Sequence, residues 1–99
     1  MLYEIVETDC FTAWRRKLKD LHVKDKVNSR IIRAGFGNFG DWKTEKGDIR
    51  AMRIDHGPGY RLYFVIRKAK IIFLLCGGDK RSQKADIERA VEIAKGVMD

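Results

Sequence analysis

Residues 49–80, IRAMRIDHGPGYRLYFVIRKAKIIFLLCGGDK, contain the pattern that decides the fold. Apolar and aromatic residues dominate three runs, at 49–54, 60–67 and 70–76. Two glycines and the chain's single proline separate the first two runs, and a tight turn at 68–69 precedes the third. Such runs between turn residues are typical of strands joined by hairpins. The stretch therefore predicts three consecutive antiparallel strands.

The flanking residues predict one more strand before this stretch, a short N-terminal strand and three helices. Residues 41–45 precede a turn at 46–48 and extend the sheet to a four-stranded antiparallel meander. Residues 2–7 form the short strand, and apolar spacing predicts the helices. The three helical stripes are Phe11, Trp14, Leu18 and Leu21; Val27, Ile31 and Ala34; and Ile87, Ala90, Val91, Ala94, Val97 and Met98. This order predicts a single α+β domain over residues 1–99.

The composition points to a small basic protein with an anionic partner. The chain has 99 residues, a net charge of +7 and 44% hydrophobic residues, which argues against disorder. Neither a membrane-length apolar run nor a signal peptide is evident, and Cys10 and Cys76 are too few for a disulfide scaffold. We expect a cytoplasmic protein with no membrane partner, and nucleic acid is the first candidate for the anion.

The positive charge is concentrated in one part of the chain. Residues 50–81 hold eight basic and two acidic residues, and eight minus two gives +6 of the total +7. The basic residues nearer the N-terminus lie among acidic ones, as on a solvated helix face. These residues are Arg15, Arg16, Lys17, Lys19, Lys24, Lys26, Arg30 and Arg33.

Strand pairing brings part of this charge together. If Ile54 pairs with Tyr60, then Arg53 lies opposite Arg61, and like charges directly opposite are unfavourable by up to about 1 kcal/mol. The two arginines either converge on a phosphate or reach solvent and pair with Glu45 or Asp55. If Arg67 pairs with Lys70 in the next hairpin, Arg61 lies opposite Cys76.

Alternation then divides the sheet into two faces. The face expected under the first two helices carries Met52, Ile54, Tyr60, Leu62, Phe64, Ile66, Ile71, Phe73 and Leu75. The other face carries Arg53, Arg61, Tyr63, Arg67, Ile72, Leu74 and Cys76, with Lys43 if Trp42 points into the core. Either the last helix or a partner protein covers the apolar residues of this second face.

The corner after the last strand adds further cations. Lys80 and Arg81 follow Gly77 and Gly78, and glycines allow a close backbone approach while a helix N-terminus favours anions. A plain glycine turn capped by Asp79 or Ser82 is the alternative. The convergence of this corner with Arg53, Arg61 and Lys43 predicts an anion site.

Ordinary catalytic groups are sparse. His56 lies in the turn beside the arginine pair and His22 at a helix junction, and no carboxylate cluster suggests a metal site. Chemistry on RNA would then proceed without metal, with the 2′-hydroxyl attacking a phosphate held by cations. A lysine would act as a base only if neighbouring cations lowered its pKa.

Five motifs resemble a known toxin family over nearly the whole chain. They are Gly40-Asp41-Trp42-Lys43, Arg50-Ala51-Met52-Arg53-Ile54, Gly57-Pro58-Gly59-Tyr60-Arg61-Leu62-Tyr63-Phe64, Leu74-Leu75-Cys76-Gly77-Gly78-Asp79-Lys80 and Gln83 with Asp86-Ile87. Their order and spacing are similar to the RelE/ParE toxin superfamily, and within it to the HigB-like branch of phage Gp49-like addiction module killer proteins.

The resemblance implies a toxin of a type II toxin–antitoxin system with a RelE-like fold. Such toxins cut mRNA in the ribosomal A site without metal or cofactor, and an antitoxin, here of the helix-turn-helix type, neutralises them. It implies phosphate binding and catalysis by Arg61 and a basic residue at Lys80 or Arg81, and Arg53 and Lys43 fall where relatives carry further basic residues. We expect Arg61, Lys80 and Arg53 to be catalytic, and Lys43, Arg81, Tyr63 and His56 to bind RNA or phosphate. Some relatives carry a catalytic tyrosine in the last helix; here Asp86, Gln83 or His56, or the cations alone, are the alternatives. The competing functions are a ParE-like inhibitor of DNA gyrase and a non-catalytic nucleic-acid-binding module.

Overall fold

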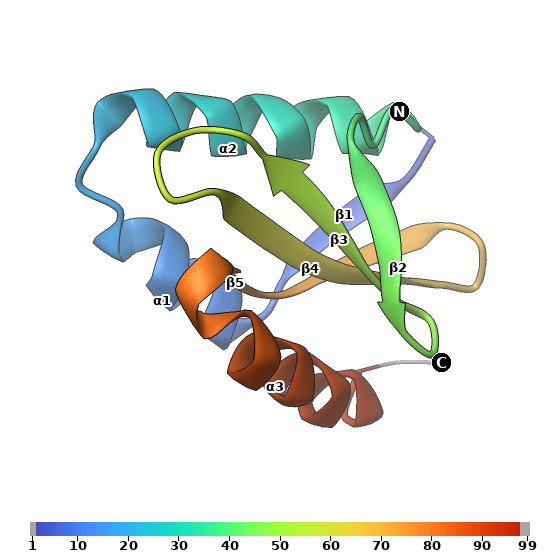
Figure 1. Cartoon of the computed structure of the whole chain (residues 1–99). Coiled ribbons are helices and arrows are strands. Elements are labelled where there is room, and N and C mark those ends of the chain that lie inside the picture. The colour runs from blue at the N-terminus through green and yellow to red at the C-terminus, as the bar shows by residue number, and fades with distance from the viewer. Residues whose placement is uncertain (1, 98–99) are drawn as a thin grey trace.

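A five-stranded sheet lies between two layers of helix, and the computed structural model describes residues 2–97 (Figure 1). The strands are β1 (Glu4–Glu7), β2 (Trp42–Lys46), β3 (Ile49–Ile54), β4 (Tyr60–Arg67) and β5 (Ile71–Asp79). The helices are α1 (Asp9–Lys17), α2 (Leu21–Gly35) and α3 (Gln83–Lys95), with a 3-10 turn η1 (Lys80–Ser82) before α3. The predicted α+β class and element order are confirmed.

The strand order is β1-β5-β4-β3-β2. The last four strands in the chain form the predicted antiparallel meander. β1 pairs in parallel with β5, from Glu4 opposite Ile71 to Glu7 opposite Leu74. A parallel neighbour needs a long crossover connection, and here α1, α2 and the other strands supply it.

The first two helices separate earlier than predicted. Thr8 caps α1 by accepting a hydrogen bond from the backbone N–H of Phe11 at 3.1 Å. The chain leaves the helix at Leu18 with extended backbone, and Asp20 caps α2 by accepting from His22 N–H at 2.8 Å. Leu21, predicted on the apolar stripe of the first helix, therefore begins α2 and is 71% exposed.

Each face of the sheet has its own core. In Figure 1, α2 lies along one face and α3 along the other. The core under α1 and α2 contains Phe11, Val23, Val27, Ala34, Met52, Ile54, Leu62, Phe64, Ile72 and Leu74. The core under α3 contains Ile49, Ala51, Tyr63, Val65, Phe73, Leu75, Cys76, Ala90 and Ala94. The last helix, one of the two predicted alternatives, thus covers the second face; Met98 of its predicted stripe lies outside the described residues.

The register of β4 with β5 differs from the prediction. Arg67 lies opposite Ile71, one residue further than Lys70, so Ile72 and Leu74 face α2 while Ile71, Phe73 and Leu75 face α3. A one-residue slip exchanges the faces of a strand. A β-bulge between Tyr63 and Phe64 adds a second shift, which places Gly78, not Cys76, opposite Arg61.

Candidate functional site

A cleft of about 420 Å³ opens where the ends of β3 and β4 meet the turn after β5. It gathers three of the cations predicted to converge, Arg53, Arg61 and Lys80. The remaining lining residues are Asp41, Ile54, Asp55, Gly59 and Tyr60. The cleft is therefore basic, with two carboxylates at its wall.

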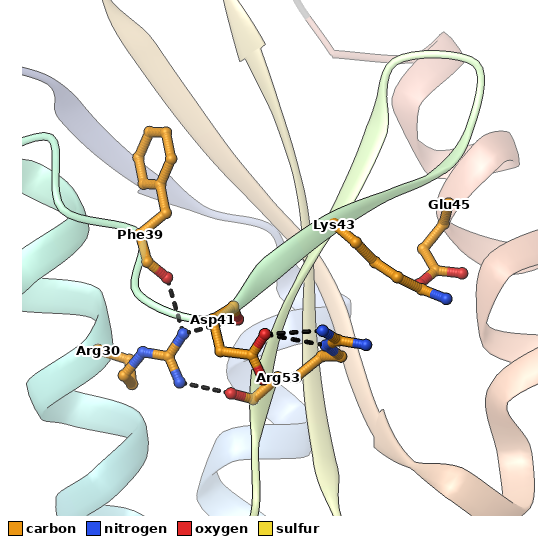
Figure 2. A network of polar contacts seen from close by, with 6 residues as sticks. All are labelled: Arg30, Phe39, Asp41, Lys43, Glu45 and Arg53. Carbon is orange, nitrogen blue, oxygen red and sulfur yellow. Dashed lines mark hydrogen bonds and ion pairs between the residues drawn. The ribbon is translucent and has the colours of Figure 1, made fainter.

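Arg53 and Arg61 lie directly opposite each other on β3 and β4, as predicted, with Ile54 opposite Tyr60. The Arg53 guanidinium donates to Asp41 Oδ1 from Nη2 at 2.7 Å and from Nε at 3.3 Å (Figure 2). Its partner is thus Asp41, not the expected Glu45 or Asp55. The carboxylate of Asp41 offsets part of the repulsion between the two arginines.

Arg61 is the buried cation of the cleft. It is 8% exposed, and its Nε is buried without a hydrogen-bond partner. Within residues 2–97 it forms no ion pair. An unsatisfied buried charge is expensive, and an anion in the cleft would supply the missing acceptors.

Lys80 enters the cleft from η1. Its backbone N–H donates to the Gly59 carbonyl at 3.1 Å, which ties the turn after β5 to the β3–β4 turn. Gly59 has φ +78°, and a Cβ there would lie 3.4–3.6 Å from the Lys80 methylenes. These distances are ordinary contacts, so it is the positive φ of the turn that favours glycine at this position.

Arg81 lies outside the cleft, over a shallow hollow that Lys80, Gln83, Lys84 and Ile87 also line. Its Nη2 donates to Asp79 Oδ2 at 2.7 Å, and its side chain is 81% exposed. This hydrogen bond lowers the pKa of the Asp79 carboxyl and raises the pKa of Arg81. Arg81 is therefore already partnered.

The other three residues expected to contact RNA do not line the cleft. Lys43 lies on the predicted face, opposite Ala51, but its side chain extends to Glu45, with Nζ 3.6 Å from Oε1 (Figure 2). His56 Nε2 lies 3.7 Å from Asp20 Oδ2, at the cap of α2. Tyr63 is fully buried under α3, and burial raises the pKa of its phenol.

We expect the Tyr63 hydroxyl to be unnecessary for stability and for RNA binding. Its Oη is buried and has no hydrogen-bond partner. We expect Tyr63→Phe to leave the free energy of unfolding unchanged or raise it by about 1 kcal/mol, because a buried unsatisfied hydroxyl is removed. Urea unfolding checks the stability, and RNA-binding affinity should stay within about twofold of the wild-type value. A tenfold loss of affinity would show that this hydroxyl reaches RNA.

Gly77 and Gly78, at the end of β5, make room for other side chains of the protein and not for an anion. A Cβ at Gly77 would lie 2.3 Å from the Trp14 ring, and one at Gly78 would lie 1.8 Å from Asp86 Oδ2. Asp86 is 2% exposed and accepts hydrogen bonds from Ser82 Oγ at 2.5 Å and Arg89 Nη1 at 3.0 Å. The expected close approach is thus taken by the protein's own side chains, and Asp86 faces the interior.

Two residues at or beside the wall of the cleft, Asp41 and Arg30, were not among the site residues predicted from the sequence. Asp41 lies opposite Arg53, whose N–H donates to the Asp41 carbonyl at 2.7 Å. Because Trp42 lies opposite Met52, extending the β2–β3 pairing by one residue places Asp41 opposite Arg53, so the sequence could have predicted this pair. Arg30, predicted on a solvated helix face, is half-buried and binds backbone carbonyls near Asp41. No local pattern in the sequence signals that contact.

Within the residues that the structure describes, the lining of the cleft includes no cysteine and no group of side chains that could hold a metal ion. Burial raises the pKa of the Cys76 thiol to about 12, so it is protonated at neutral pH, and Cys10 is also a free thiol. Among residues 2–97, no three His, Cys, Asp or Glu side chains gather to hold a metal ion. In the same residues, no helix combines the length and apolarity needed to cross a membrane.

Comparisons with known proteins give a sequence relative and structural relatives. No family model matches the chain. An uncharacterized protein of Haemophilus influenzae is 45% identical over 95 residues, which cover 96% of each chain. The free-state structure of a double mutant of the E. coli toxin RelE aligns with a TM-score of 0.69. The alignment covers 99% of this chain and 100% of that one at 17% identity, so it shows the fold, and the expected RelE-like fold is confirmed.

Proposed function

The chain belongs to one protein family with the Haemophilus influenzae protein and has the RelE fold, and from this premise we propose that it is the toxin of a type II toxin–antitoxin system. In this proposal it belongs to the HigB-like branch and inhibits translation by cutting mRNA on the ribosome. The observation that carries the proposal is the buried, unpaired Arg61 in a cleft shared with Arg53 and Lys80. Three cations around one small cleft can stabilise the extra negative charge that a phosphodiester develops during cleavage.

The proposed reaction uses the RNA's own hydroxyl and needs no metal or cofactor. The 2′-oxygen forms a bond to phosphorus while the bond to the 5′-oxygen breaks, which leaves a 2′,3′-cyclic phosphate and a 5′-hydroxyl. Arg61 and Arg53 stabilise the extra negative charge on the non-bridging oxygens. Lys80, which has no ion pair within residues 2–97, donates a proton to the departing 5′-oxygen.

Asp55 is the proposed acceptor of the 2′-hydroxyl proton. It lines the cleft and is exposed, and it has no ion pair in the described part of the chain. The earlier candidates are less suited: Asp86 is buried away from the cleft, and His56 lies against Asp20. Gln83 lines the shallow hollow beside Arg81.

The antitoxin is proposed as the natural partner of the same cleft. A helix-turn-helix antitoxin with an acidic segment would place carboxylates against Arg61 and Lys80 and mask them. The complex would form in the cytoplasm, where the ribosomes are. An open reading frame for such a protein beside the toxin gene would support this pairing.

The test of the proposed function is induced expression in growing cells with RNA end mapping. We expect growth arrest and cleavage at translated codons, and Lys80→Met should reduce cleavage about 100-fold because charge stabilisation and the proton donor are both lost. Lys95→Met is the matched control, since Lys95 is a lysine at the end of α3 that does not line the cleft and pairs with Glu92 at 3.0 Å. Trapped gyrase–DNA complexes with continuing translation, or RNA binding without cleavage by purified protein on programmed ribosomes, would each overturn the proposal.

A further inference from the structure

Arg30 links α2 to both segments that form one wall of the cleft (Figure 2). Its Nη2 donates to the carbonyl oxygens of Phe39 at 2.7 Å and Asp41 at 3.0 Å. Its Nη1 donates to the carbonyl oxygen of Arg53 at 2.5 Å. One guanidinium therefore holds three backbone carbonyls from two segments, the approach to β2 and the end of β3.

Gly40 is shaped to receive this guanidinium. The residue has φ +62°, and a Cβ there would lie 2.9–3.1 Å from Arg30 Nη2, Nε and Cζ. Any side chain would meet the guanidinium and also strain the backbone. The glycine and the arginine therefore form one packing unit.

The positively charged guanidinium of Arg30 donates its hydrogen bonds to neutral backbone carbonyl groups. It forms no ion pair within residues 2–97, and burial lowers its pKa, opposed by the nearby Asp41. Hydrogen bonds from a charged donor are stronger than neutral ones, and the planar guanidinium can bridge several acceptors where a lysine ammonium cannot match the geometry. The hydrogen bonds of Arg30 are thus directed to three particular carbonyl groups, whereas a side chain on a solvated helix face would mainly contact water.

The two segments held by Arg30 carry the ion pair of the cleft. Asp41 and Arg53 line the cleft, whereas Arg30 lines a neighbouring hollow of about 420 Å³ on the side of α2, which shares Ile54 and Asp55 with the cleft. The hydrogen bonds of Arg30 reach the cleft wall through backbone carbonyls, and its charge lies near the Asp41 carboxylate. We propose that Arg30 is a positioning residue that fixes the Arg53–Asp41 pair at the wall of the cleft, so that the Arg53 guanidinium is set to meet a phosphate opposite Arg61. The proposal rests on the proposed function in treating the cleft as a phosphate site.

The first measurement follows the Arg53 side chain directly by NMR. In the wild-type protein, the hydrogen bond to Asp41 should make the Arg53 Nε–H exchange with water more slowly than that of a free arginine. In Arg30→Lys the exchange should speed up about fivefold or more, because the backbone that aligns the pair is released. Arg67, which is bonded to Asp48 on the far side of the sheet, is the internal reference and should not change.

The second measurement is a double-mutant cycle on binding of inorganic pyrophosphate, followed by calorimetry at low salt. Arg30→Lys should weaken binding about fivefold when Arg53 is present, and by less than about twofold in an Arg53→Met background. Arg33→Lys is the matched control on the same helix: its side chain makes no hydrogen bond in the described residues and should leave binding unchanged. Equal losses in both backgrounds would overturn the proposal, because Arg30 would then act independently of Arg53.

A substitution at Gly40 tests the same contact between the guanidinium of Arg30 and the backbone. Gly40→Ala should push the guanidinium away and reproduce the faster Arg53 exchange of Arg30→Lys. Unchanged exchange at Arg53 in folded Arg30→Lys would also overturn the proposal, whatever the binding result. If the wild-type protein bound pyrophosphate without help from Arg61, the proposed function would fail, while the NMR measurement would still decide the role of Arg30.

Discussion

Replacing Arg61 by methionine is expected to reduce ribosome-dependent mRNA cleavage about 100- to 1,000-fold, as for loss of one main charge-stabilising donor. The same variant should keep its melting temperature or exceed that of the wild-type protein. The reason is that Arg61 is buried with an unsatisfied Nε, and a buried unpaired charge opposes folding. Single-turnover cleavage on programmed ribosomes and thermal unfolding measure the two effects.

Arg67→Met is the matched control for this prediction. Arg67 lies on the same strand and also has a buried, unpaired Nε, but its Nη1 donates to Asp48 at 2.6 Å, away from the cleft. Cleavage by this variant should be within a few fold of the wild-type rate. A large loss in both variants would point to general charge on the sheet and not to the cleft.

Gly78→Ala is expected to lower the free energy of unfolding by at least about 3 kcal/mol, because the new methyl group overlaps a buried carboxylate. The Cβ would lie 1.8 Å from Asp86 Oδ2 and 2.9 Å from Ser82 Oγ, and Asp86 is held by Ser82 and Arg89. Urea unfolding of the purified protein measures the loss.

Gly96→Ala provides the comparison for the glycine substitution. A Cβ at Gly96 would lie 3.6 Å from the Ile93 carbonyl oxygen, an ordinary contact, so stability should change by no more than about 1 kcal/mol. In a double variant, Asp86→Ala should remove the obstacle, and the combined loss should be smaller than the sum of the two single losses. Additive losses would contradict the proposed overlap.

The β3–β4 hairpin could be predicted from the sequence because its turn is marked. Gly57, Pro58 and Gly59 limit the turn to a few conformations, and this places Arg53 opposite Arg61. The next hairpin could not be predicted so well. Lys68 and Ala69 both adopt positive φ, which their residue types do not signal, and the β-bulge near Tyr63 leaves no mark in the alternation of apolar residues.

The sequence predicts those parts of the candidate site that depend on strand register and on residues that follow one another in the chain. Arg53, Arg61 and Lys80 meet because two strands pair and the turn after β5 follows directly. The contact of Arg30 with Asp41 and Arg53 depends on how a helix packs against a loop, and such tertiary contacts have no local periodicity. Burial of Tyr63 likewise depends on α3 covering a face that the sequence left open.

The position of β5 beside β1 has a consequence for how the protein is made. The Thr8 hydroxyl donates to the Leu75 carbonyl at 2.7 Å, across 67 residues of chain. During synthesis β1 therefore has no strand to pair with until β5 has been made, and closing such long-range contacts is slow. Lys80 follows β5, so a nascent chain carries Arg53 and Arg61 without a complete cleft. In the proposed function, the phosphate site is therefore completed only when β5 and the turn after it have folded against β4.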